Sequence, residues 1–185
     1  MKKPNAKQRI LETSAALFAE RGYCSVGVNE IIEKSETAKA SFYQHFPSKE
    51  NLAANWLADA HARSDARHTA ILGAPGDAGE KVVAYFEDLK DWIEAREFRG
   101  CPFTNTAAGL IGKSPPISEL VELHKLSIRD FFIQLAQEIV PSDSDARHLG
   151  TTCFLLYSGA TVESQNLKAS WPVKAAIVAV RHLVS

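Results

Sequence analysis

Apolar residues recur every three or four positions over most of this chain, which is typical of amphipathic helices. In the first such stretch, Leu11, Ala15 and Phe18 share one helical face, and Gly22 offers a stop after them. Strand-like alternation of apolar and polar residues is hard to find. The pattern therefore predicts an all-α protein whose first helix ends near residue 22.

The stretch "TAKASFYQHFPSKENL", residues 37–52, predicts a short helix that buries only one edge. At about 100° per residue, Ala38, Phe42 and Phe46 form one apolar stripe. Thr37 suits the N-cap of this helix. The other faces carry small or hydrogen-bonding side chains: Lys39, Ala40, Ser41, Tyr43, Gln44 and His45. Such a helix is better suited to contact a partner than to fill a core.

Another short helix is expected to begin at Val28, with Gly27 at its N-cap, and the tight "KSETA" connects it to the helix described above. Three short helices, with the second and third joined by a tight turn, are the pattern of a helix-turn-helix. Helical hairpins that bind nothing are also common. The pattern alone leaves both interpretations open.

The rest of the chain predicts a larger helical body. Further helices are expected after Pro47, from Lys49 to about Leu72, from Glu80 to Glu97, in a short segment ending at Ile111, from Ile117 to Val140, after "PSDSD", and from about Pro172. The clearest break is "GAPGDAG", residues 73–79, and "FRGCPFTN" is interpreted as a turn. We divide the chain into a compact head, residues 1–50, and a body, residues 51–185.

Charge distribution adds a weak indication of function. The chain has 185 residues and a net charge of −1. Residues 1–50 hold eight Lys/Arg and six Asp/Glu, a balance of +2, against −3 for the remainder. A mildly basic head is compatible with DNA binding by that head.

Cysteine usage and hydropathy indicate the compartment. Cys24, Cys101 and Cys153 are odd in number and scattered, which argues against a disulfide framework or a zinc site. The longest apolar run, Ala175 to Val180, is far too short to span a bilayer, and no secretory signal is visible. We expect a cytoplasmic protein that has no membrane partner.

The segments "FAERGY" and "VGVNEIIEKSETAKASFYQHFPSKENL" resemble the signature of the TetR family of bacterial transcriptional regulators, over roughly residues 8–57. The resemblance implies an all-helical fold, a DNA-binding domain at residues 1–50, and a ligand-binding and dimerisation body at residues 51–185. It also implies a repressor that binds double-stranded, palindromic operator DNA as a homodimer and is released by a small apolar or aromatic effector.

The DNA-binding positions implied by the resemblance are Gly27, Lys39, Ala40, Ser41, Tyr43, Gln44, His45 and Lys49. Lys39, Ser41 and Gln44 would face base edges or nearby phosphates, since lysine and amide side chains pair with purine edges. Ala40 lacks bulk and would let the helix settle into the groove. Tyr43, His45 and Lys49 would clamp the phosphate backbone.

The sequence departs from the family pattern at three positions. Glu36 replaces the usual turn glycine, Ala38 the usual serine, and Gly27 the usual hydroxyl residue at the start of the second helix. Glu36 can reach the backbone conformation of a turn glycine only with some strain. These departures leave the expected fold unchanged but make the operator sequence hard to infer.

The segment "REFRGCPFTN" resembles a turn in one branch of the family that links the helices lining the ligand cavity. We expect an apolar, partly aromatic cavity with polar anchors at Thr104 and Asn105. Its candidate residues are Trp92, Cys101, Phe103, Thr104, Asn105, His124, Phe131, Cys153 and Tyr157. For His124, a satisfied, half-buried histidine is the simpler interpretation, and hydrogen bonding to a ligand is the alternative.

Cys101 has two interpretations that the sequence leaves open. Arg96 and Arg99 lie close to it in the sequence, and cationic neighbours favour the reactive thiolate form of a cysteine. An electrophile or oxidant could then modify the thiol. The simpler interpretation, which we favour, is that Cys101 is a small apolar residue packed at the end of a helix. We favour induction by non-covalent ligand binding.

The last two expected helices are candidates for a dimer interface. "HLGTTCFLLYSGATVESQNL" is apolar around much of its circumference, and "VKAAIVAVRHLV" is rich in alanine and valine. The resemblance assigns both to a homodimer contact. A helix pair within a monomeric core is the alternative.

A helical ligand-binding protein or enzyme without DNA function is the competing hypothesis. The chain contains no GxSxG, HExxH, CxxC or phosphate-loop pattern, and we expect no catalytic residue and no cofactor. His61, Asp65 and His68 have a spacing that could hold a metal. A solvated polar helix face is the simpler interpretation, so we expect no metal site.

Overall fold

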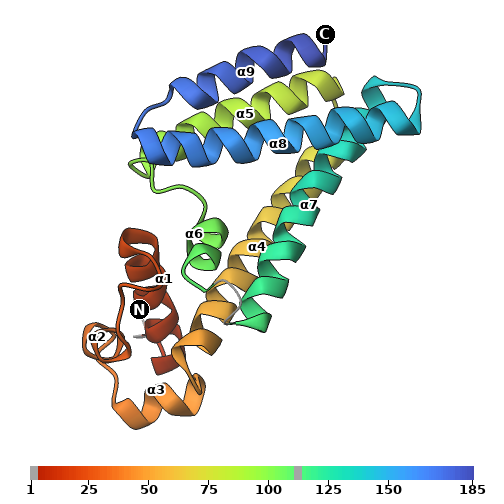
Figure 1. Ribbon diagram of the computed structural model, residues 1–185. Helices are drawn as coiled ribbons and strands as arrows, with labels where there is room; N and C mark the ends of the chain where they lie inside the picture. Colours follow the sequence, from red (N-terminus) through yellow and green to blue (C-terminus); the bar gives the residue numbers. More distant parts are fainter. Residues whose placement is uncertain (1–3, 111–113) are drawn as a thin grey trace. The chain divides into compact units, whose positions relative to one another are not determined.

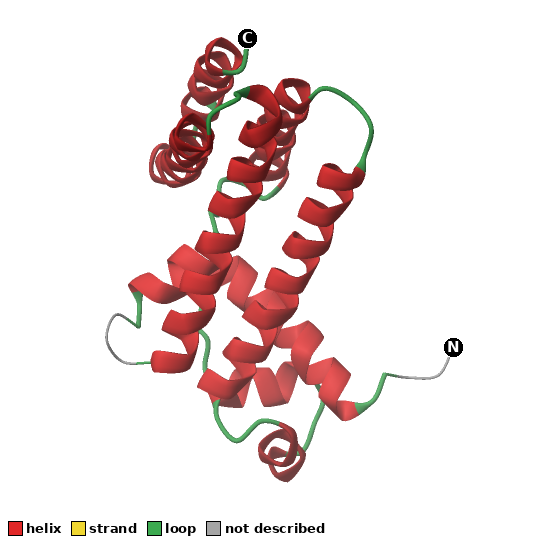
Figure 2. Cartoon of the chain, turned by 90° about the vertical axis from the view of Figure 1, so that its right-hand side faces the viewer, coloured by secondary structure: helices red, strands yellow, loops and turns green. Residues whose placement is uncertain are grey.

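The computed structural model describes residues 4–110 and 114–185, and every regular element in those ranges is an α-helix (Figure 1). In chain order the helices are α1 (Ala6–Arg21), α2 (Val28–Lys34), α3 (Lys39–His45), α4 (Lys49–Gly73), α5 (Ala78–Ala95), α6 (Pro102–Ala108), α7 (Pro115–Ile139), α8 (Asp143–Leu167) and α9 (Trp171–Leu183). Figure 2 shows helices joined by loops throughout the same part of the chain. The all-α prediction is confirmed.

Local capping explains where the helices differ from their predicted bounds. Helix α5 begins before Glu80 because the Asp77 carboxylate accepts a hydrogen bond from the Glu80 amide at 2.9 Å. The predicted N-cap at Thr37 is wrong, since Ala38 holds that position and the Thr37 hydroxyl lies 2.8 Å from that of Ser35. Ala38 is also exposed, so the prediction that it shares a buried stripe with Phe42 and Phe46 is wrong for this residue.

The turn predicted at "FRGCPFTN" is only half correct. Pro102 begins α6, because proline suits the first turn of a helix, where its missing amide hydrogen costs no bond. Gly100 supplies the preceding turn with a φ of 69°. Ile111, the expected end of this segment, lies outside the described residues.

The chain divides into two compact units. The N-terminal unit comprises Met1–Ala62 and Pro102–Glu122, and the C-terminal unit comprises Arg63–Cys101 and Leu123–Ser185. Helices α4 and α7 contribute residues to both. In the described ranges, no helix combines the length and apolar character needed to cross a bilayer.

In the N-terminal unit α1 packs on α2 and α3, and α4, α6 and α7 also contribute buried side chains. Its largest fully buried side chains are Ile10, Ile31, Phe42, Phe46, Phe103, Leu52, Leu57 and Ile117. The Phe18 and Trp56 rings approach with centroids 5.4 Å apart and join α1 to α4. Each such side chain contributes roughly 1.5–3 kcal/mol on burial, so the positions of α2 and α3 are set mainly by apolar packing.

In the C-terminal unit, α5, α8 and α9 lie side by side (Figure 1). Phe86, Phe132 and Leu135 are at the centre of its core, and Val173 and Val180 pack there from α9. This core is where α5, α7, α8 and α9 bury their apolar faces.

Candidate nucleic-acid interface

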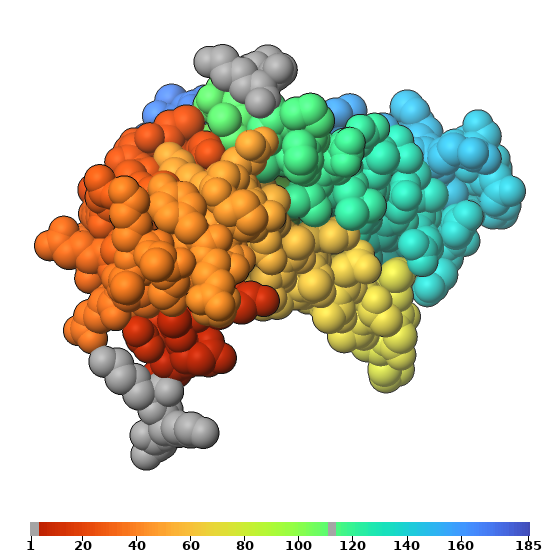
Figure 3. All heavy atoms as spheres, turned by 90° about the horizontal axis from the view of Figure 1, so that it is seen from below, coloured from red at the N-terminus to blue at the C-terminus, as the bar shows by residue number. Residues whose placement is uncertain are grey.

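Helix α3 presents the predicted reading side chains on its outer faces. Phe42 and Phe46 are 0% and 1% exposed and anchor the helix in the core, as predicted. Lys39, Ala40, Tyr43 and Gln44 are exposed, and Ser41 and His45 are half-buried. In Figure 3, the view from below shows the orange surface that includes α3. The structure thus brings six candidate residues together on one short, firmly anchored helix.

The turn between α2 and α3 is strained at Glu36. Its φ of 51° lies in the left-handed region, as expected where an acidic residue replaces a turn glycine. The Glu36 amide donates to the carbonyl of Glu33 at 3.0 Å, and the Thr37 amide donates to that of Ile32 at 3.2 Å. The strained conformation is therefore held by backbone hydrogen bonds on both sides.

Arg9 holds the same turn from α1. Its guanidinium donates to the carbonyls of Ser35 and Glu36, each at 3.0 Å, and to that of Pro4 at 2.9 Å. A cation at the C-terminus of α2 also interacts favourably with the helix dipole. Sequence reasoning missed this role, because the acceptors are backbone atoms up to 27 residues away along the chain and no local pattern marks them.

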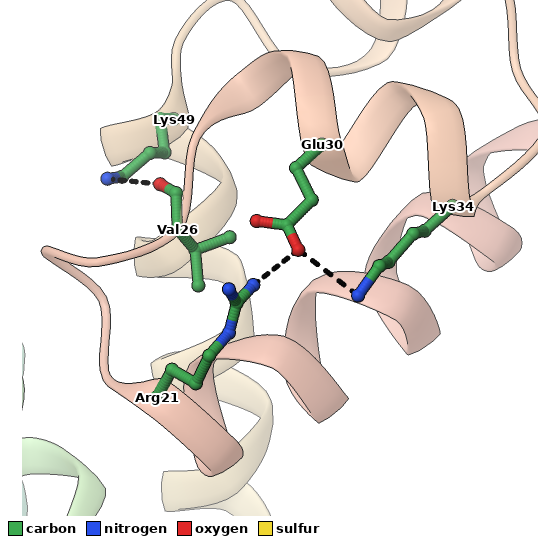
Figure 4. Close-up of polar contacts among 5 residues, drawn as sticks. All are labelled: Arg21, Val26, Glu30, Lys34 and Lys49. Carbon is green, nitrogen blue, oxygen red and sulfur yellow. Dashed lines mark hydrogen bonds and ion pairs between the residues drawn. The ribbon is translucent and has the colours of Figure 1, made fainter.

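Ion pairs link α1 and α2. Arg21 and Lys34 both contact the Glu30 carboxylate, the latter at 3.1 Å (Figure 4). The hydrogen bond from Arg21, and then that from Lys34, lower the pKa of Glu30. The side chain of Glu30 on α2 is thereby held between a partner on α1 and one on the next turn of α2.

Lys49, at the start of α4, contacts the chain's own loop. Its ammonium donates to the carbonyl of Val26 at 2.7 Å (Figure 4) and lies 4.1 Å from the centroid of the Tyr23 ring. Burial lowers the pKa of Lys49. The neighbouring candidate, Gly27, is the exposed N-cap of α2 and has open space around the position of a Cβ. Lys49 therefore bridges α4 and the loop that leads into α2.

The candidate ligand-binding residues fall in both units. Phe103, Thr104 and Asn105 lie on α6 in the N-terminal unit, where Phe103 is buried and the other two are half-buried. The C-terminal unit holds Trp92, Cys101, His124, Phe131, Cys153 and Tyr157. Among these, Trp92, Phe131, Cys153 and Tyr157 belong to one apolar cluster. His124 is 6% exposed and is therefore buried rather than half-buried as predicted.

A buried polar network crosses this cluster. The His68 Nε2 atom lies 2.9 Å from the Tyr85 hydroxyl, and the His68 ring stacks on Phe131 with centroids 4.4 Å apart. Burial raises the pKa of Tyr85 to about 12 and raises that of Tyr157 well above its usual value. Both phenols are therefore neutral hydrogen-bonding groups at physiological pH.

The interpretation of His61, Asp65 and His68 as a solvated face is wrong for His68. That side chain is only 4% exposed, because α5 and α7 pack over it through Tyr85 and Phe131. Asp65 is exposed and accepts a hydrogen bond from Ser127 at 2.7 Å. Within residues 4–110 and 114–185, no group of three side chains is placed to hold a metal ion.

The chain is similar to known bacterial regulators. Residues 10–55 match the family described as "Bacterial regulatory proteins, tetR family". The HTH-type transcriptional regulator LmrA of Bacillus subtilis is 26% identical over 171 residues, 91% of each chain. The HTH-type transcriptional repressor NemR of Escherichia coli is 21% identical over 193 residues, 98% of this chain and 94% of the relative.

Solved structures have the same fold. A TetR-family transcriptional regulator from Streptomyces coelicolor superposes with a TM-score of 0.88 at 25% identity, covering 97% of this chain and 94% of the other. The reduced form of E. coli NemR gives a TM-score of 0.83 at 19% identity, covering 98% of both chains. The matched region includes α2 and α3, the helices that present and support the candidate reading side chains.

Proposed function

The chain belongs to the TetR family of bacterial transcriptional regulators, and from that premise we propose that it is a repressor of palindromic operators. A small apolar or aromatic effector would release it from DNA. The outward-facing α3, anchored by Phe42 and Phe46, is the observation that supports DNA reading. The family is one of regulators, so the enzyme hypothesis is set aside. We also propose a cytoplasmic location, which a bacterial DNA target requires.

The proposed homodimer uses α8 and α9. Leu155 and Leu167 on α8, and Trp171, Val178 and Leu183 on α9, are large apolar side chains at least 42% exposed. Gly159 is exposed on α8, one turn from Leu155, and a Cβ there would meet nothing within 4 Å. Its lack of a side chain therefore has no explanation in the packing of the monomer, but it would allow a second helix to approach closely.

A two-fold dimer sets the spacing of the operator. Two copies of α3 would enter successive major grooves on one side of the duplex. The half-site centres should then lie about 34–36 Å apart, or a multiple of that distance. Selection of bound duplexes from a random pool would recover the site and reveal its symmetry and spacing.

Gln44→Ala is expected to relax base discrimination at one position in each half-site, by roughly 1–3 kcal/mol if the amide contact is bidentate. The reason is that Gln44 is exposed on α3, where its amide can donate and accept at a purine edge. Selection from a random pool with wild type and variant measures the change. Tyr43→Phe is the matched control, since removing a hydroxyl predicted to meet phosphate should weaken binding without changing the selected site. An unchanged site for Gln44→Ala would contradict the groove assignment.

The proposed effector site is the aromatic cluster of the C-terminal unit. Tyr85, Phe132 and Tyr157 surround one another with ring centroids 5.3 to 6.2 Å apart. Arg96 lies over the Trp92 ring at 4.9 Å. Aromatic side chains together with a few neutral phenols and a cation suit a planar apolar ligand that carries hydrogen-bond acceptors. Ligand binding would favour a conformation unsuited to DNA.

An alkylating agent is expected to leave Cys101, and through it DNA binding, unchanged. The reason is that this residue is only 6% exposed, so the reagent has little access to its thiol. Cys24 is exposed, so the comparison is made in the Cys24→Ser background, with and without Cys101→Ser. We expect N-ethylmaleimide to leave the DNA affinity of both proteins equal, as measured by fluorescence anisotropy. Release that occurs only when Cys101 is present would favour the thiol mechanism over non-covalent induction.

A further inference from the structure

Helix α2 begins without a side-chain cap. Its N-cap residue is Gly27, which has no side chain to accept a hydrogen bond from the first amides of the helix. The residue before it, Val26, has its side chain 1% exposed, and its amide donates to Tyr23 at 3.4 Å. The direction in which α2 leaves the loop therefore depends on what holds the backbone around Val26.

Lys49, at the start of α4, holds the backbone at Val26 in place. Its ammonium donates to the Val26 carbonyl at 2.7 Å, and the Tyr23 ring lies against it at 4.1 Å from the centroid. Both contacts are to the loop between α1 and α2. The Tyr23 ring in turn packs on Phe18, with centroids 5.6 Å apart, and Phe18 packs on Trp56 of α4. Lys49 thus closes a ring of contacts that joins α4, the loop and α1.

We propose that Lys49 is a positioning residue for DNA recognition, which holds the start of α2 through the Val26 carbonyl and the Tyr23 ring instead of neutralising a DNA phosphate. The inference rests on the proposed DNA-binding function. It gives Lys49 a role different from that of Lys39, which is exposed on α3 and can reach the groove. Because α2 packs on α3, loss of the Lys49 contacts to the loop between α1 and α2 would let both helices shift together.

Salt dependence separates the two roles. A cation that contacts phosphate contributes about 0.9 to the slope of log affinity against log salt concentration, whereas a positioning residue contributes nothing to it. The probe is the duplex selected with the wild-type protein. Lys49→Met keeps an unbranched side chain of similar length but removes the ammonium that lies over the Tyr23 ring. Lys39→Met is the matched control.

We expect Lys49→Met to lower the affinity by a factor of roughly 10 at every salt concentration with the wild-type slope, while Lys39→Met reduces the slope by about one. Tyr23→Leu, which removes no charge, should also weaken binding at constant slope, and the Tyr23→Leu/Lys49→Met pair should be non-additive. A slope reduced by Lys49→Met as much as by Lys39→Met, or an unchanged affinity, would overturn the proposal.

Hydrogen exchange tests the same contact without DNA. The Ile31 amide donates to the Gly27 carbonyl at 3.2 Å in the first turn of α2. Lys49→Met should make this amide exchange at least about fivefold faster, because the start of the helix opens more often. The amide of Val180, buried in the other unit, is the internal reference. Unchanged exchange at Ile31 would overturn the proposal. If the wild type failed to bind any duplex, the proposed DNA-binding function would be refuted. The exchange measurement would still decide whether Lys49 holds the start of α2 in place.

Discussion

Replacing both Leu155 and Val178 by glutamate should convert the regulator into a monomer and lower its affinity for a palindromic operator by roughly 10²–10⁴-fold. The two side chains are 62% and 56% exposed, so the substitutions remove little that stabilises the monomer. In a two-fold interface each carboxylate would be buried near the same groups of a second copy. Burying unpaired charges is costly, and the dimer would dissociate.

The loss of affinity follows from the geometry of two-site binding. When the DNA-binding unit of one protomer is bound, it holds that of its partner near the second half-site. Separating the protomers removes this high effective concentration. Sedimentation equilibrium measures the oligomeric state, and fluorescence anisotropy with the selected duplex measures the affinity.

Leu123→Glu is the matched control for this experiment. Leu123 is 51% exposed and lies on α7, outside the proposed interface. The control should remain dimeric and keep its operator affinity. A Leu155→Glu/Val178→Glu protein that stays dimeric, or a control that dissociates equally, would show that α8 and α9 do not form the interface.

Gly150→Ala should destabilise the protein by roughly 1–3 kcal/mol, although alanine is normally the better helix former. Gly150 lies in α8, and a Cβ there would come within 2.5 Å of the Cα atom and 2.6 Å of the amide nitrogen of Ile133 on α7. These are backbone atoms, which cannot rotate away as a side chain could. The two helices would have to separate, and the apolar core around Phe132 would lose contacts.

Thermal unfolding measures this effect, with a shift of about 2–4 °C per kcal/mol for a chain of this size. Gly159→Ala is the control within the same helix, because a Cβ there meets nothing within 4 Å. Both substitutions are made in the monomeric Leu155→Glu/Val178→Glu background, so that dimer contacts do not contribute. Gly159→Ala should stabilise the protein by up to about 1 kcal/mol. Equal changes for the two glycines would contradict the close approach at Gly150.

Much of the fold could be predicted because its signals are local. The helical period, the break at Pro47 and the glycine-rich break after Leu72 lie within a few residues of the elements that they define. The errors in the predicted helix boundaries are also small and arise from neighbouring residues. Asp77 and Ala38 moved two helix starts by one or two residues, since the choice between neighbouring caps depends on small energy differences.

The candidate reading helix was also identifiable from local sequence. Phe42 and Phe46 lie one turn apart, so a core that buries one will bury the other, and Tyr43 and Gln44 between them are exposed. The positive φ at Glu36 was expected from the resemblance to the family, in which a glycine usually holds this turn position. Short-range geometry therefore determined which side chains of α3 face outward.

The roles of several residues were decided only by tertiary structure. The Ser35 and Glu36 carbonyls accept from Arg9, and the Val26 carbonyl accepts from Lys49. These backbone acceptors lie at least 23 residues away in the sequence, and any residue type could supply them. His68 is buried because α5 and α7 pack over it, and the spacing of residues along α4 does not predict that packing. Gly150 and Gly159 occupy the same helix and look alike in the sequence, yet one touches a neighbouring backbone and the other faces open space. The sequence by itself determined where the helices run and which face of α3 is outward, because those properties depend on neighbours within about one helical turn. The basic side chains that support α2 and α3 do so through contacts between elements far apart in the chain. Only the packed structure specifies those contacts.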